Sequence, residues 1–303
     1  MKQLQNIIIV FLLMFSLAEI GWSQCAGDVN CDGVVDGLDV SILAADFGTT
    51  GCGNCDNVIA RVEELEEKVA VLEDLLLHFR RDENDIFIEG ANLHIRNTDE
   101  NGSTNTINGL GNLIVGYNEL RGTGDDRNGS HNVVIGTKHN YSAYGGLVVG
   151  QNNEISGNYA SVSGGHDSIA SGTWSSVSGG SYNQASRANS SVSGGRDNTA
   201  AAESASISGG RYNSATGDYS SVSGGGSLYM GQGNRAEGAF SSVNGGILNY
   251  AQGEYSSVNG GASNYAIGRF SSVAGGQSAN VNRESSSVVG DAGNVYVDNA
   301  TVH

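Results

Sequence analysis

The sequence has no proline, few cationic residues and few cysteines. Its 15 lysines and arginines face 32 aspartates and glutamates, and the formal net charge is -17. Such a charge repels phosphate backbones and anionic lipid headgroups, so we expect no nucleic acid partner. In a chain without proline, glycine is the main residue that can form tight turns. The 46 glycines and an excess of serine are, however, poor material for a compact core. Internal repeats are therefore the first feature to expect.

Long apolar runs are also absent, except at the start of the chain. A lysine precedes an apolar run from Ile7 to Leu17, and the small residues Gly21 and Ser23 follow where a signal peptidase cuts. The run is too short to span a bilayer comfortably. We interpret residues 1–23 as a cleaved secretory signal, with an uncleaved N-terminal anchor and a lipoprotein acylated at Cys25 as alternatives. The mature protein is then expected outside the cell, secreted or at the cell surface.

The four cysteines all lie in one block, residues 24–56. Export implies an oxidising compartment, so two disulfides are expected, and three connectivities are open. A zinc site built from all four cysteines is the alternative, although the spacing of the first pair is unlike that of a zinc ribbon. The disulfide candidates are Cys25, Cys31, Cys52 and Cys55.

The same block contains DVNCDGVVDGLD, which has the spacing of a calcium-binding loop. Calcium takes oxygen ligands from a loop that turns sharply at its sixth position, where Gly33 stands here. Carboxylate or amide side chains occupy loop positions 1, 3, 5, 9 and 12, and the backbone carbonyl of Val34 offers position 7. An acidic surface turn is the alternative. The predicted Ca²⁺ ligands are Asp28, Asn30, Asp32, Val34, Asp36 and Asp39.

An aspartate at loop position 12 and a following helix from Leu38 to Phe47, ended by Gly48, resemble the calcium repeat of dockerins, the modules that bind cohesins. The resemblance covers about 25 residues, and one such repeat is present where dockerins normally carry two. It implies calcium binding and, as an alternative function, docking to a cohesin-like anchor in an extracellular complex.

Residues 57–81 show a heptad pattern. Apolar residues recur at spacings of 4 and 3, which predicts a coiled coil, although an amphipathic helix packed on a domain has the same pattern. Cations at the g positions, Arg61 and Lys68, precede acids at the following e positions, Glu66 and Glu73, which is the pairing of a parallel coil between chains. We interpret the segment as a parallel intermolecular coil, whose chain number the seam leaves open. The seam is Val58, Val62, Leu65, Val69, Leu72, Leu76 and Phe79.

A 15-residue repeat fills most of residues 105–303, after a connector with expected strands at 82–104. In the copy YSSVNGGASNYAIG at 255–268, an aromatic residue, a valine, two glycines, an asparagine and an alanine keep fixed offsets. Six extra residues, near Ser227 to Gln232, interrupt the period once. The Val or Ile of each copy stands at 162, 177, 192, 207, 222, 243, 258, 273 and 288, and looser copies lie upstream at 112–116, 132–136 and 146–150.

A period of 15 is too short for a helical repeat and fits one small coil of a β-solenoid. Each coil would hold two short strands joined at glycine corners with positive φ, and the coils would stack by parallel hydrogen bonding about 4.8 Å apart. The asparagine at a fixed corner suggests a ladder of side chains that cap backbone groups. Few apolar residues per coil leave a single solenoid under-stabilised, so several chains burying a shared face are expected, tied together by residues 57–81.

The motifs SVSGG, NxAxG and YSSV resemble the head repeats of trimeric autotransporter adhesins, the YadA-like heads. NGLGNLIVGYNE at 108–119 and SHNVVIG at 130–136 are similar to the start of such a head. The resemblance covers about residues 105–294, with the coil before the head, whereas the family's usual order is the reverse. It implies a mainly β fold, a left-handed parallel β-roll in which three chains pack side by side as a homotrimer.

Catalysis needs titratable groups that converge, and the repeats offer serine, asparagine, glycine and scattered charges. His166, Asp167 and Ser168 are adjacent in sequence, but neighbours at one strand corner rarely converge, and His131 and His139 are interpreted as loop residues. The paired glycines are followed by neither lysine nor helix, so we do not interpret them as phosphate loops. We expect no enzyme activity, with a polysaccharide lyase on a β-helix as the enzyme alternative.

The leading hypothesis is a secreted trimeric adhesin-like or cell-surface fibre protein whose β-roll head attaches to a host surface, matrix or glycan. An inert spacer or extracellular filament is the second hypothesis, and a cohesin-docked component of a complex is the third. A heterogeneous face on the solenoid would favour the adhesin. The interrupting loop is either a partner-binding element or a cover for a neighbouring chain, and its candidate residues are Leu228, Tyr229 and Met230.

Overall fold

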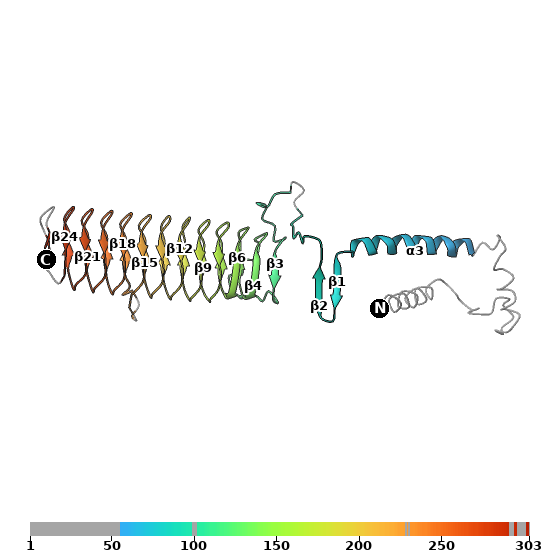
Figure 1. Ribbon diagram of the computed structural model, residues 1–303, viewed down its shortest axis with the longest axis horizontal. Coiled ribbons are helices and arrows are strands. Elements are labelled where there is room, and N and C mark those ends of the chain that lie inside the picture. Colours follow the sequence, from blue (N-terminus) through green and yellow to red (C-terminus); the bar gives the residue numbers. More distant parts are fainter. Residues whose placement is uncertain are drawn as a thin grey trace. The chain divides into compact units, whose positions relative to one another are not determined.

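The computed structural model describes residues 55–98, 102–227, 229, 231–290, 294–295 and 301–302. The chain divides into two compact units, Met1–Leu93 and His94–His303, and each is described by itself. Figure 1 shows the helix and strands of both units. Several predicted features lie outside the described residues: the signal segment, the calcium loop from Asp28 to Asp39, the cysteines Cys25, Cys31 and Cys52, and the side chain of Cys55.

In the first unit, the described residues form one helix, α3 (Cys55–Leu75), and one hairpin, β1 (Phe79–Asp82) with β2 (Asp85–Ile88). The helix covers most of the heptad segment at 57–81. The hairpin supplies the strands expected in the connector at 82–104, but it begins three residues earlier.

The helix ends before the heptad seam does. The N–H of Leu77 donates to the carbonyl of Asp74 at 3.2 Å, which tightens the last turn. Phe79, the last seam position, pairs instead with Ile88 in the antiparallel hairpin. The heptad spacing cannot separate these outcomes, because phenylalanine suits both a seam and a strand.

The apolar seam of α3 is uncovered in the described part of the first unit: Val62 and Leu72 are 42% and 54% exposed. The cations predicted to pair between chains lie against their own helix. Arg61 Nη1 and Lys68 Nζ are 2.6 and 2.5 Å from the two carboxylate oxygens of Glu64. The hydrogen bond from Lys68, followed by that from Arg61, lowers the pKa of Glu64. Such exposed ion pairs add little stability. The apolar stripe of the helix therefore remains open to solvent, and these pairs do not compensate for its exposure.

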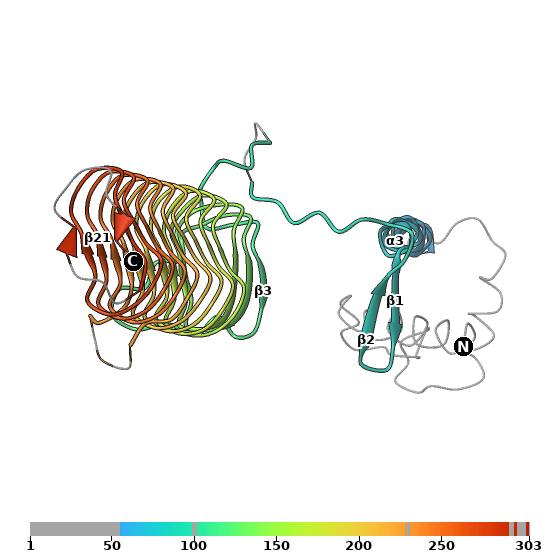
Figure 2. The ribbon, with the colours of Figure 1, turned by 60° about the vertical axis from the view of Figure 1, so that its left-hand side comes forward.

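The second unit is a parallel β-solenoid, which confirms the predicted mainly β class (Figure 1). Figure 2 looks partly along its axis and shows the turns one behind another. In the described part of this unit the strands form two parallel sheets of 13 and 11 strands, and from β4 onward successive strands alternate between the two sheets. The valine sheet contains β3 (Leu113–Val115), β4 (Val133–Thr137), β6 (Leu147–Gln151), β8 (Ser161–Val162), β10 (Ser176–Val177), β12 (Ser191–Val192), β14 (Ser206–Ile207), β16 (Ser221–Val222), β18 (Ser242–Val243), β20 (Ser257–Val258), β22 (Ser272–Val273), β24 (Ser287–Val288) and β26 (Thr301–Val302). The alanine sheet contains β5 (Asn140–Tyr141), β7 (Glu154–Ile155), β9 (Ile169–Ala170), β11 (Gln184–Ala185), β13 (Thr199–Ala200), β15 (Ser214–Ala215), β17 (Arg235–Ala236), β19 (Tyr250–Ala251), β21 (Tyr265–Ala266), β23 (Asn280–Val281) and β25 (Asn294–Val295).

The 15-residue period fixes the register of the regular turns. Val177 pairs in parallel with Val192, one period later. The insertion does not disturb this register, because Ala215 pairs with Ala236 across it. The six extra residues therefore lie outside the stack of strands.

The upstream copies belong to the valine sheet, and the turns that begin at the copies 132–136 and 146–150 are one residue shorter than the regular turns. Val134 pairs with Val148, and Val148 pairs with Val162, a spacing of 14. The residue that is missing is the first glycine of the pair. The remaining Gly150 has φ 109°, and its counterpart Gly165 has φ 80°, a region that favours glycine. Without the extra residue β6 runs on for five residues, whereas β8 has two.

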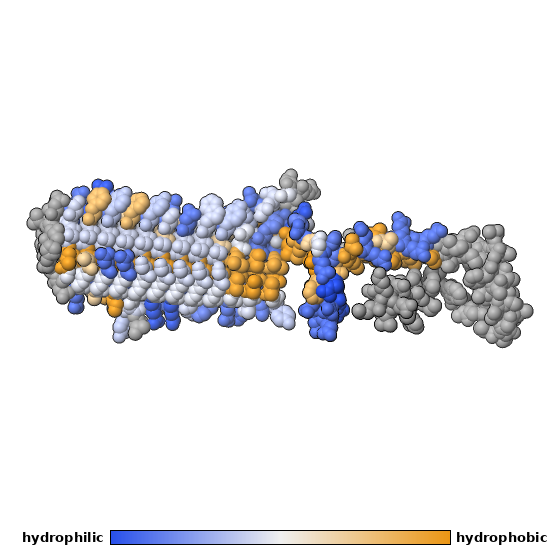
Figure 3. All heavy atoms as spheres, in the orientation of Figure 1, coloured by the Kyte–Doolittle hydropathy of each residue, from blue (hydrophilic) through white to orange (hydrophobic). Residues whose placement is uncertain are grey.

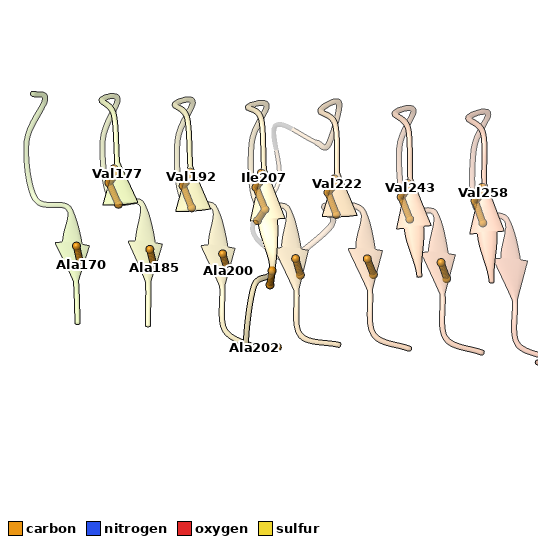
Figure 4. Close-up of a cluster of buried hydrophobic side chains, with 14 of the residues drawn as sticks. Ala170, Val177, Ala185, Val192, Ala200, Ala202, Ile207, Val222, Val243 and Val258 are labelled. Carbon is orange, nitrogen blue, oxygen red and sulfur yellow. The ribbon is translucent and has the colours of Figure 1, made fainter. Parts of the chain in front are cut away.

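The core of the regular turns is one valine and one alanine wide. Val177 and Ala185 are fully buried, and their counterparts along the stack repeat the arrangement (Figure 4). Tyr141 and Ile155 replace the alanine in the first two turns. A fully buried valine contributes about 1.5–3 kcal/mol and an alanine less, so hydrogen bonds between turns must carry much of the stability.

A ladder of buried asparagines confirms the predicted capping role of this side chain. The Nδ2 group of Asn198 donates to the carbonyls of Gly194 and Gly210, both at 3.0 Å. Its Oδ1 accepts the backbone N–H of Asn213 at 3.0 Å. Both ends of the amide are thus paired, which offsets the cost of burying it. The rungs are Asn153, Ser168, Asn183, Asn198, Asn213, Asn234, Asn249 and Asn264.

His139 forms the rung before Asn153 and takes the part of an asparagine. It lies between β4 and β5, in keeping with its interpretation as a loop residue, but it is only 2% exposed. Its Nδ1 accepts the N–H of Asn153 at 3.2 Å, and its Nε2 donates to the carbonyl of Ile135 at 3.1 Å. The arrangement requires a neutral ring with its proton on Nε2. Burial is the main cause that lowers the pKa of His139.

The first edge of the alanine sheet is covered by the loop before β4. The N–H of Tyr141 donates to the carbonyl of Asp126 at 2.9 Å. Arg121 Nη2 donates to the carbonyls of Asn152 and Asn153 at 2.8 and 2.9 Å. An edge that would otherwise recruit another strand is therefore occupied.

Replacing Asn198 by alanine should destabilise the solenoid. The carbonyls of Gly194 and Gly210 and the N–H of Asn213 lose their partner, at a cost of about 1–3 kcal/mol. The urea midpoint should fall accordingly. Asn259→Ala removes an exposed amide from the same array and should leave the midpoint nearly unchanged, and equal midpoints for the two variants would contradict the ladder's role.

Acid should weaken the first rung. The unfolded chain takes up a proton at His139 near its ordinary pKa of about 6.5, whereas the folded chain resists because its pKa is lowered. The stabilisation is therefore full above about pH 6.5 and declines as the pH falls below it. In His139→Asn the amide makes the same bonds without titrating, so its melting temperature should depend less on pH between about 7 and about 5. Identical pH slopes for the two proteins would refute this.

Candidate ligand-binding surface

The two sheets present different outward side chains. On the valine sheet the outward residue before each valine or isoleucine is serine from β8 to β24. On the alanine sheet the equivalent positions vary in size, charge and polarity. A heterogeneous face is the feature expected of a binding head rather than a spacer. Its outward residues are Glu154, Ile169, Gln184, Thr199, Ser214, Arg235, Tyr250, Tyr265 and Asn280.

The first three strands of the valine sheet present an apolar outward surface, seen as a block of orange in Figure 3. Leu113 and Val115 are 42% and 52% exposed, and Ile135 is 37% exposed. Contiguous exposed apolar surface of this kind marks an interaction site. We call it the N-terminal apolar face; it consists of Leu113, Val115, Val133, Ile135, Leu147 and Val149.

Aromatic side chains stack at one corner of the later turns. The rings of Tyr219, Phe240, Tyr255 and Phe270 follow one another at 5.0, 4.9 and 5.0 Å between centroids. All four residues have φ of 57° or 58°, a region that bulky residues rarely adopt. The prediction of a glycine with positive φ is therefore wrong for this corner, where stacking of the aromatic rings offsets the backbone strain. The rings cover one another's faces and leave their edges exposed.

A second aromatic cluster lies on the alanine sheet after the insertion. The rings of Tyr250 and Tyr265 stack at 4.8 Å, and the guanidinium of Arg235 lies 5.5 Å from the Tyr250 ring. Beside them, Gln252 Nε2 donates to the Glu237 carboxylate at 2.9 Å. Before the insertion, the equivalent positions carry smaller side chains, so the surface changes character at this point.

The six extra residues form a loop at one corner and leave the stack near β15 (Figure 1). Tyr229 is 71% exposed. Leu228 and Met230, the other predicted binding residues, lie outside the described residues. The loop begins after Gly226, which still pairs with Arg211 of the preceding turn. It returns at Gly233, which lies against the carbonyl of Tyr212. Both ends of the loop therefore lie against the backbone of the turn before it.

The adjacent His166, Asp167 and Ser168 do not form a catalytic array. His166 Nδ1 lies 2.7 Å from Asp167 Oδ2, but the hydroxyl of Ser168 donates to the backbone carbonyl of His166 at 3.3 Å. Burial acts to raise the pKa of Asp167, and the hydrogen bonds from His166 and Asn152 outweigh it and lower the pKa. Ser168 serves as a rung of the ladder by accepting the N–H of Asn183 at 3.3 Å.

His131 anchors the connector that precedes the solenoid. Its Nε2 accepts the N–H of Asn97 at 3.3 Å, and its Nδ1 lies 3.2 Å from the carbonyl of Thr104. Both ring nitrogens thus face backbone groups. Sequence reasoning did not foresee this contact, because the two segments are far apart in the chain.

No known protein-family model matches this chain, and no curated protein matches it. Within the described residues, no helix is long and apolar enough to cross a bilayer. The same residues contain no cluster of three or more His, Cys, Asp or Glu side chains that fits a metal ion.

Proposed function

We propose that the chain is a secreted or cell-surface adhesin-like fibre protein, in which three copies associate and present solenoid heads for attachment. The resemblance to YadA-like heads supports a left-handed roll and a parallel trimer. The observation that carries the proposal is the contrast between an uncovered apolar N-terminal part and a varied alanine sheet. The apolar N-terminal part needs further copies of the chain to bury it, and the alanine sheet offers a surface for a partner.

Uncovered apolar surfaces follow one another along the sequence. The seam of α3 is open, and in the hairpin Ile86 and Ile88 are 73% and 36% exposed. The N-terminal apolar face comes next in the chain. Association of copies would bury all three, and it would compensate for a core that is only one valine and one alanine wide.

Attachment is favoured over the spacer alternative by the side chains outside the core. A spacer needs only uniform turns, as on the serine face of the valine sheet. The large outward side chains of Arg235, Tyr250 and Tyr265 are not required for one turn to stack on the next. Tyrosine and arginine are also the residues most often found at the centre of binding interfaces. An enzyme is disfavoured because His166 and Ser168 are committed to structural hydrogen bonds.

Trimer formation should depend on the N-terminal apolar face. Light scattering at micromolar concentration should give three times the chain mass. Ile135→Asn with Leu147→Asn should lower that mass, because amides oppose burial of this face. Thr199→Asn with Gln184→Asn, on the alanine sheet, is the matched control and should remain trimeric. A wild-type mass equal to one chain would contradict the proposal.

Attachment is tested separately with the intact trimer on immobilised glycans and matrix proteins. Retention on at least one surface supports the adhesin. A trimer that none of these surfaces retains would support the spacer instead.

For the N-terminal module we propose calcium binding, with a dockerin-like role in anchoring as the alternative function. Asp28, Asn30, Asp32, Asp36 and Asp39 supply the side-chain ligands, together with the carbonyl of the residue at loop position 7. Calorimetry of the disulfide-bonded chain should show one Ca²⁺ per chain. Asp32→Ala should weaken binding at least tenfold by removing a charged ligand, and no calcium heat from the intact protein would refute the site.

A further inference from the structure

The aromatic column at one corner of the solenoid is interrupted for two turns. At this corner the N–H of each residue donates to a carbonyl of the turn before it at 2.8–3.0 Å, and φ lies between 53° and 58°. These bonds place four residues at the same corner of four successive turns: Trp174, Asn189, Ser204 and Tyr219. Two small side chains therefore separate two aromatic rings, and we call the gap between the rings the corner notch.

Both ends of the corner notch are open ring faces. The ring of Trp174 stacks on Tyr159, with 5° between the ring planes, and the ring of Tyr219 stacks on Phe240, with 4°. Tyr159 lies one turn before the notch and Phe240 one turn beyond it, so these contacts cover the outer face of each ring. Trp174 and Tyr219 are 59% and 52% exposed. Their uncovered faces are therefore turned toward each other across the notch.

The far end of the later stack shows that a terminal ring can be closed. Phe270 stacks on Tyr255, and the guanidinium carbon of Arg269 lies 4.5 Å from the centre of the Phe270 ring. Arg269 is held there by Glu254, at 3.1 Å. Neither ring of the corner notch has such a cation over it in the described part of the chain. The open faces are thus a feature of these turns and not of the repeat.

The side chains between the two rings are free to bind a ligand. The amide of Asn189, the hydroxyl of Ser204 and the carboxylate of Glu203 have no hydrogen-bond or ion-pair partner among the described residues. Together they offer hydrogen-bond donors and acceptors. Three turn spacings put the two ring planes about 14 Å apart. The notch therefore has room for a short saccharide with one sugar ring on each aromatic face.

The chemistry of the notch favours a neutral sugar. The apolar C–H face of a sugar ring packs on an aromatic face, while its hydroxyl groups bond to side chains such as amides and carboxylates. Unpaired nucleic acid bases also stack on aromatic rings, but their backbone needs a groove lined with cations. The charged residues next to this corner in the same turns are Arg187, Glu203 and Asp218, so the local charge is negative. A polyanion is therefore disfavoured.

We propose that the corner notch binds a neutral oligosaccharide, with one sugar ring on Trp174 and another on Tyr219. This inference rests on the proposed function, since it names the chemistry to which the head would attach. Three copies in a trimer would repeat the notch, so weak single contacts would gain strongly in avidity on a surface that repeats the saccharide.

The experiment measures retention of the intact protein on immobilised cellohexaose, chitohexaose and mannohexaose, with polygalacturonate and single-stranded DNA as acidic comparators. Retention is expected on at least one neutral saccharide. Trp174→Leu should weaken it about tenfold by removing one stacking face. Tyr255→Leu is the matched control, because both faces of that ring are already covered, and it should change retention less than twofold. Leucine fits this type of corner, since Leu248 has φ 57°.

A second variant fills the notch and keeps the fold. Asn189→Tyr with Ser204→Tyr would continue the stack from Trp174 to Tyr219, so the melting temperature should stay level or rise while retention falls about tenfold. In a chain with Trp22→Phe, the retained saccharide in soluble form should shift the emission of Trp174 to saturation. The filled variant should show no such shift.

The proposal is overturned if no neutral saccharide retains the protein, if Trp174→Leu and Tyr255→Leu lose retention equally, or if the filled variant binds like the wild type. Retention on polygalacturonate or single-stranded DNA as strong as on the neutral saccharides would also contradict it. Attachment to a matrix protein that persists in the filled variant would leave the adhesin function standing without this site.

Discussion

Parallel stacking of each turn on the next is the interaction on which the solenoid depends. A regular turn buries little more than one valine and one alanine, so its two strands of two residues have no stability of their own. Backbone bonds and the asparagine ladder join each turn to its neighbours. Because the bonds run between turns, the array gains stability by length, as in other repeat proteins.

This constraint separates positions that must repeat from those that are free. The inward valine, the inward alanine and the ladder asparagine are each buried at a position that accepts few other side chains, so they repeat with few exceptions. The outward positions and the corners carry no such demand. An insertion is tolerated at a corner because Ala215 and Ala236 still pair across it. Function can therefore vary on the surface without disturbing the stack.

The same separation explains what the sequence could predict. The period, the strands and the ladder follow from inward residues such as Val177, Ala185 and Asn198, whose repetition is visible in one chain. His139 could not be foreseen as a rung, because its imitation of asparagine depends on ring geometry and not on spacing. Phe79 suits both a heptad and a strand, so its place depends on which partner is available.

The fold does not require aromatic residues at the corner that contains Tyr219. Asn189 and Ser204 occupy the same corner as Tyr219, with φ of 58° and 53°, and they have no ring to stack. The left-handed conformation is therefore imposed by the turn, and asparagine satisfies it at lower strain. Tyr159 and Trp174 stack at the same corner in the early turns, so aromatic residues there recur without being required by the turn. From Tyr219 onward they coincide with Tyr250 and Tyr265 on the alanine sheet, so the turns around and after the insertion carry large side chains on two sides while their core stays the same.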